Sequence, residues 1–87
     1  MNIDRFNHIY MDCDVLPNGI CVVYRRDQLK DTLYDELKKY NWKAKILSIE
    51  RIYYDVSFTD TGIEFQLPES NNIKVGQYEV QLKKQTS

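Results

Sequence analysis

The 87-residue sequence is poor in the residues on which many functional motifs depend. It has three Gly, all isolated from one another, so it has no glycine-rich loop that could hold nucleotide phosphates. No apolar run approaches the roughly 20 residues that a transmembrane helix needs. The N-terminus also lacks the basic segment and apolar block of a signal peptide. We therefore expect a cytoplasmic protein without a membrane segment.

An excess of charge of either sign is also missing. Twelve Lys and Arg against 13 Asp and Glu leave a net charge of −1. This balance argues against a strongly basic nucleic-acid binder and against an acidic mimic of DNA. Hydrophobic residues make up 43% and charged residues 29%, a composition typical of globular proteins. The length then predicts a single domain over residues 1–87.

The two cysteines, Cys13 and Cys21, are predicted to be reduced residues of the core, because the cytoplasm keeps thiols reduced. They flank a hairpin that Pro17 and Gly19 predict, with a three-residue loop and a glycine bulge. This register places Val15 opposite Cys21 and leaves the two cysteines on diagonal positions. A relaxed disulfide cannot span that separation.

Residues 27–40 have the pattern of an amphipathic helix. Leu29, Leu33 and Leu37 recur every four residues and form one apolar stripe. Asp27 is the predicted N-cap. We expect this stripe to bury the helix against the sheet.

The remaining strands are predicted from apolar alternation. Residues 44–58 are predicted to form one strand, and a turn over residues 59–62 places Phe58 opposite Ile63. A last strand over residues 73–83 has a bulge at Gly76. The predicted fold is therefore α+β: an antiparallel sheet of four to five strands, in the chain order strand, strand, helix, strand, strand, strand, with one helix packed on one face.

The nearest approach to a metal or acid–base site is a group of three residues on the first predicted strand. His8, Asp12 and Asp14 share one face of that strand if it is regular. A metal site needs further ligands and supporting contacts, which the sequence does not offer. We favour a solvated face with Asp12 or Asp14 near Arg25 or Arg26. We also predict no metal, no cofactor and no catalytic residues.

An exposed stripe is the strongest candidate for a binding surface. On a regular strand Leu47, Ile49, Arg51 and Tyr53 point away from the helix. Exposed Tyr, Arg and aliphatic side chains together are typical of protein-binding hot spots. A bulge in the strand would instead turn Leu47 and Ile49 inward, and the sequence leaves both readings open.

A second candidate lies where the predicted helix ends. Trp42 stands among several lysines, and aromatic rings among basic side chains are used by proteins that bind single-stranded nucleic acids. The alternative is a Trp that seals the end of the core. The residues of this candidate nucleic-acid site are Lys38, Lys39, Trp42, Lys43 and Lys45.

The leading hypothesis is a non-enzymatic module that binds a protein, either a host protein or a second copy of itself. A weak nucleic-acid-binding domain is the alternative. The chain has one Ala but eight Ile, eight Lys and seven Tyr, the usage expected of an AT-rich genome. This composition is associated with small accessory or inhibitor proteins of bacterial viruses and mobile elements.

Overall fold

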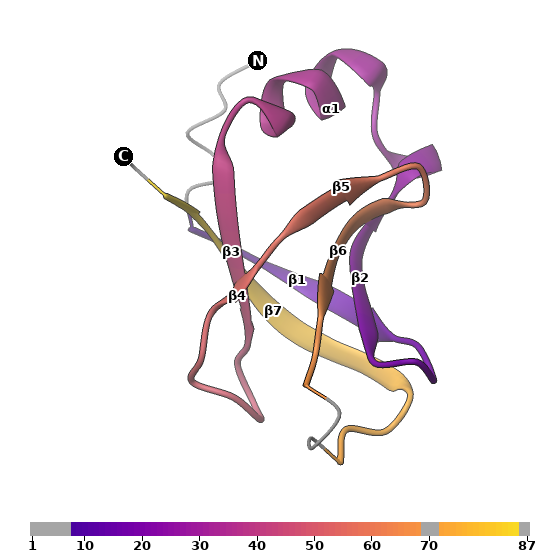
Figure 1. Ribbon diagram of the computed structural model, residues 1–87, viewed down its shortest axis with the longest axis vertical. Helices are drawn as coiled ribbons and strands as arrows, with labels where there is room; N and C mark the ends of the chain where they lie inside the picture. Colours follow the sequence, from indigo (N-terminus) through magenta and orange to yellow (C-terminus); the bar gives the residue numbers. More distant parts are fainter. Residues whose placement is uncertain (1–7, 69–71, 86–87) are drawn as a thin grey trace.

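The chain runs up and down in antiparallel strands that curl into a nearly closed barrel, with a helix over one end (Figure 1). The computed structural model describes residues 8–68 and 72–85. The elements there are β1 (His8–Val15), β2 (Ile20–Arg25), the 3-10 turn η2 (Arg26–Gln28), α1 (Asp31–Lys38), β3 (Asn41–Ile46), β4 (Tyr54–Asp55), β5 (Ser57–Thr59), β6 (Gly62–Gln66) and β7 (Gly76–Gln85).

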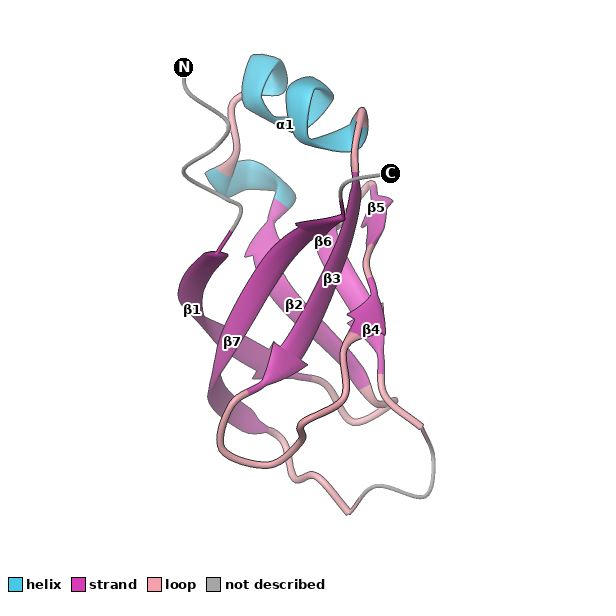
Figure 2. Cartoon of the chain, turned by 90° about the vertical axis from the view of Figure 1, so that its left-hand side faces the viewer, coloured by secondary structure: helices cyan, strands magenta, loops and turns pink. Residues whose placement is uncertain are grey.

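One short segment closes the barrel. The sheet order is β4-β3-β7-β1-β2-β6-β5, so the strands at its two ends, β4 and β5, follow each other directly in the chain. β4 pairs Asp55 with Lys43 of β3, whereas β5 pairs Phe58 with Ile63 of β6. Between them the amide of Val56 donates to the carbonyl of Trp42 at 3.1 Å. Residues 54–59 therefore bridge both ends of the sheet, as Figure 2 shows from the side.

The predicted α+β sheet of four to five strands with a helix on one face is wrong. Seven strands form one curled sheet in the described residues. The helix lies across an end of the barrel, because the sheet has curled its apolar face into the interior (Figure 1). A closed sheet covers its own apolar face and leaves a helix only an end to seal.

The single strand predicted over residues 44–58 is also wrong. β3 ends at Ile46, where a turn begins, and the amide of Glu50 donates to the Ile46 carbonyl at 2.9 Å. The chain returns to the sheet at Tyr54. The change of phase between Leu47 and Ile52 therefore marks a turn that leaves the sheet, and not a bulge within a strand.

The core consists of the inward-facing residues at alternating positions of the strands, and these side chains fill the barrel. In β1 these are Cys13 and Val15, and every long strand contributes a similar pair. The buried apolar residues are Cys13, Val15, Cys21, Val23, Leu29, Tyr34, Leu37, Trp42, Ala44, Ile46, Ile63, Phe65, Leu67, Val80 and Leu82. The interior is thus a packed core and not a ligand cavity, as expected for so small a barrel.

The helix begins later than its sequence pattern predicts. Asp27 lies in η2, Leu29 is in extended conformation, and α1 starts at Asp31. The face that meets the barrel therefore includes Tyr34, whose hydroxyl donates to the carbonyl of Thr59 at 3.0 Å. Leu37 is buried as predicted, whereas Leu33 is only partly buried.

The predicted register of the first hairpin is confirmed, and that of the second is confirmed only next to its turn. Val15 pairs with Cys21, and the amide of Gly19 donates to the carbonyl of Leu16 at 2.9 Å. Gly19 has a φ of +85°, which a glycine adopts without strain. The second turn opposes Phe58 and Ile63, but beyond it the chain leaves β6 for β3. Gly76 begins β7, so the bulge predicted there within a longer strand is wrong.

Candidate functional site

Exposed apolar side chains gather in the connections at one end of the barrel. The connections after β1 and β3, and residues 72–75 ahead of β7, lie at the end opposite α1 (Figures 1 and 2). They carry Leu16, Ile49, Ile52 and Val75, which are 40%, 44%, 59% and 63% exposed. We call these four residues the loop end. Among the described residues, the other exposed large hydrophobic side chains are Tyr10 and Tyr40.

The stripe predicted from residues 47–53 does not form, because these residues do not share a strand. Leu47 is half-buried, and its amide donates to the carbonyl of Glu79 at 3.0 Å. Ile49 and Arg51 are exposed in the connection between β3 and β4. Tyr53 belongs to a different surface. The predicted residues therefore lie on different surfaces. Ile49 belongs to the loop end, and Arg51 lies in the same connection.

Tyr53 lies on the outer surface of β3 and β7. Its hydroxyl donates to Oε1 of Gln81 at 3.4 Å. The ammonium groups of Lys45 and Lys83 lie 5.0 Å and 5.7 Å from its ring centroid. Gln81 is buried although it points outward, because Tyr53 and His8 cover its amide. The ring is therefore a packing element of the sheet surface and is only partly available to a partner.

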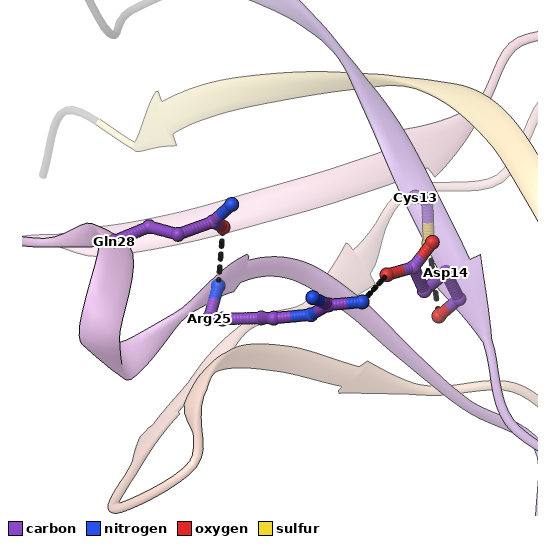
Figure 3. Close-up of polar contacts among 4 residues, drawn as sticks. All are labelled: Cys13, Asp14, Arg25 and Gln28. Atoms are coloured by element: carbon purple, nitrogen blue, oxygen red, sulfur yellow. Dashed lines mark hydrogen bonds and ion pairs between the residues drawn. The ribbon is translucent and has the colours of Figure 1, made fainter.

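Asp14 and His8 of β1 are held by local partners. Arg25 forms an ion pair with Asp14 at 3.0 Å, while the Arg25 amide donates to Oε1 of Gln28 (Figure 3). The predicted contact of Asp12 or Asp14 with Arg25 or Arg26 is thus confirmed for Asp14 and Arg25. His8 contacts Gln81 through Nδ1. Within residues 8–68 and 72–85, no three His, Cys, Asp or Glu side chains are grouped so that they could hold a metal ion.

The two cysteines lie inside the barrel. Cys13 and Cys21 are free and fully buried, which confirms that they are unpaired core residues. A hydrogen bond with the Cys21 side chain, together with burial, raises the pKa of the Cys13 thiol far above its usual range. A thiol held in its protonated form is a poor nucleophile.

This burial predicts strong protection of both thiols. A water-soluble disulfide reagent should leave Cys13 and Cys21 unmodified in the folded protein, because neither sulfur meets solvent. In denaturant without reductant the same reagent should titrate both. Rapid modification of the folded monomer would contradict their position in the core, and no reactive thiol in denaturant would reveal a disulfide.

The predicted nucleic-acid site loses its aromatic residue. Trp42 is 3% exposed, and its indole N–H donates to the carbonyl of Leu37 at 2.9 Å. The ring seals the end of the barrel beneath α1 and cannot stack on a base. Trp42 therefore has the packing role that was the alternative reading of the sequence.

The lysines beside Trp42 border an open groove of about 690 Å³. Lys38, Lys39 and Lys43 line it together with Tyr40. Lys39 is paired with Glu36 and Lys43 with Asp55, each at 2.9 Å. Lys45 lies elsewhere, above Tyr53. The groove has basic walls, but two of its three lysines already have an acidic partner.

Comparisons with known proteins give no relative: no protein-family model, curated protein or solved structure matches the chain. In the described part of the chain no helix is long and apolar enough to cross a membrane.

Proposed function

We propose that this protein is a non-enzymatic binding module that engages a protein partner through the loop end. The observation that carries the proposal is that Leu16, Ile49, Ile52 and Val75 are exposed in connections at the same end of the barrel. Large apolar side chains exposed on one part of a soluble protein are typical of interaction sites. The partner is a host protein, and the module acts by occluding it.

Burial of the loop end supplies the driving force. Fully burying one aliphatic side chain contributes about 1.5–3 kcal/mol, so two or three such anchors offset part of the cost of association. Arg51 is exposed in the same connection as Ile49 and Ile52. Arginine is enriched among hot-spot residues and gives directional contacts beside the aliphatic anchors.

The scaffold supports such a role. The connections start and end on strands whose inward residues are buried, so the barrel fixes where each connection leaves the sheet. Binding residues are disproportionately carried on loops that a rigid scaffold positions. The buried free thiols agree with a reducing compartment, so we propose that the protein acts in the cytoplasm. Its composition is the reason for proposing that it is an accessory or inhibitor protein of a bacterial virus or mobile element.

Weak nucleic-acid binding in the groove of Lys38, Lys39 and Lys43 is the second candidate. Tyr40 lines the same groove and is 39% exposed, so it is the aromatic side chain that could stack there. Ion pairing of Lys39 and Lys43 weakens this candidate. Phosphate-driven binding falls steeply with salt, whereas apolar protein contact largely survives.

The decisive variants place charge in each candidate site. The partner is captured from nuclease-treated lysate of the native cell, purified, and titrated in low and high salt. Ile49→Asp combined with Ile52→Asp should weaken its binding by about a hundredfold, because two anchors are lost. Tyr40→Asp, which also charges an exposed apolar position, is the matched control and should bind as wild type.

Two results would overturn the proposal. One is normal binding by the double variant with an unchanged melting temperature. The other is binding that nuclease or salt removes and that Tyr40→Asp abolishes, which would transfer the function to the lysine groove.

A further inference from the structure

A second surface of the barrel has a charge pattern that its own sheet does not neutralise. On the outer face of β1 and β7, Tyr10 pairs with Gln81. Two residues away on one side, His8 pairs with Lys83. Two residues away on the other side, Asp12 pairs with Glu79. We call these six residues the polar face.

The acidic end of the polar face opposes like charges across the strands. Asp12 and Glu79 are directly opposite each other, an arrangement that destabilises an antiparallel pair. The basic end repeats this with Lys83, which lies opposite Lys43 of β3 as well as His8. Within residues 8–68 and 72–85, Asp12, Glu79 and Lys83 take part in no ion pair, although all three are exposed.

The two ends are arranged symmetrically about the row of Tyr10 and Gln81. Glu79 precedes Gln81 by two residues and Lys83 follows it by two. Because a strand rises about 3.4 Å per residue, each charge lies about 7 Å from the central row. A second copy can be generated by a 180° rotation about an axis that lies in the face along this row. The rotation places position 83 of one copy over position 79 of the other, and position 8 over position 12. The charges of β1 and β7 are therefore complementary to themselves, whereas Lys45 of β3, which pairs with Gln81 on the same row, is brought near its own symmetry mate.

We propose that the polar face binds the same face of a second copy of this chain, in a two-fold dimer. Lys83 of each copy then meets Glu79 of the other, and His8 meets Asp12. Tyr10 lies on the axis and is 64% exposed, so its ring can pack against its symmetry mate. Glu79, which opposes the like charge of Asp12 in one chain, thereby gains an ion pair with Lys83 of the other chain.

The dimer is expected to be weak. The two strands that carry the face are about 4.8 Å apart and contribute three outward-facing residues each. Such a contact falls at the low end of specific interfaces. Charge complementarity then determines its orientation and its salt dependence. The loop end is not involved, so dimerisation and partner binding are independent properties.

A charge exchange tests the pairing directly. Glu79→Lys alone brings four basic groups together in a dimer, and Lys83→Glu alone brings four acidic groups together. Each should weaken self-association about tenfold or more, as measured by sedimentation at high protein concentration and low salt. An equal mixture of the two variants should form a heterodimer as tight as the wild-type dimer or tighter, because both contacts again join opposite charges.

Two controls accompany the mixture. Asp35→Lys makes the same charge change as Glu79→Lys on the exposed surface of α1 and should dimerise like wild type. The chain that carries both Glu79→Lys and Lys83→Glu should dimerise with itself. Ile49→Asp with Ile52→Asp should leave the dimer intact, which separates this inference from the proposed function.

The proposal fails if the wild-type protein is monomeric under these conditions or if mixing the folded variants restores nothing. It also fails if added single-stranded oligonucleotide binds the wild type and Lys83→Glu abolishes that binding without any dimer being present. That result would assign the basic end of the face to phosphate.

Discussion

Gly62→Ala should destabilise the barrel by about 3 kcal/mol or more, a large part of the total stability of a domain of this size. Gly62 begins β6 with a φ of +142°, a conformation that L side chains rarely adopt. An added Cβ would lie 2.0 Å from the Tyr24 carbonyl oxygen and 2.9 Å from the Arg26 amide nitrogen. The neighbouring atoms belong to the backbone of the paired strand, so relief requires separating β6 from β2.

Gly76→Ala is the matched control. Gly76 begins β7, and an added Cβ there would have its nearest neighbour at 3.9 Å, an ordinary contact with the Tyr78 ring. Its φ lies outside the left-handed region, so we expect a change within about 1 kcal/mol of either sign. Urea unfolding of both variants measures the difference. Equal effects at the two positions would contradict the close approach of β6 to β2.

Phe65→Ala should cost about 3–5 kcal/mol, because it empties the centre of the packed interior. Phe65 is 1% exposed, pairs with Cys21 of β2, and stacks on the ring of Tyr54 at 5.8 Å between centroids. Tyr54 lies in the segment that closes the barrel. Loss of the Phe65 ring therefore removes both core volume and a contact that holds the closing segment.

Phe58→Ala is the comparison for this variant. Phe58 is the same residue type on the paired strand, but it is only half-buried, so its loss should cost less. The free energies of unfolding from denaturant titration give the order. If Phe65→Ala proved as mild as Phe58→Ala, the interior would be looser than the structure indicates.

The local parts of the fold could be predicted from the sequence. The residues around Pro17 and Gly19 determine the register of the first hairpin, and residues 59–62 determine that of the second. Barrel closure could not be predicted in the same way. It depends on a change of partner at Val56, from β3 to β6, and nothing in the residues near Val56 encodes which distant strand lies on either side.

The candidate sites were predicted only in part, because exposure depends on where a strand ends. Ile49 and Arg51 are exposed as predicted, but on a connection. Tyr53 packs on the sheet instead of standing free. Ile52 alternates with Tyr54, as residues of a half-buried strand do, but it lies outside any strand and is 59% exposed. No pattern in the sequence marked Leu16 or Val75 as a binding residue, because only the closed barrel brings their connections to one end.

The most direct test of the central claim is a map of partner contact by photo-crosslinking. A photoreactive residue replaces Ile52 at the loop end, Tyr40 in the lysine groove, or Asp35 on α1, and each protein is irradiated in lysate with and without nuclease. The account predicts one discrete protein adduct from position 52, unchanged by nuclease, and none from positions 40 and 35. Adducts from position 40 that nuclease removes, with no adduct from position 52, would contradict it.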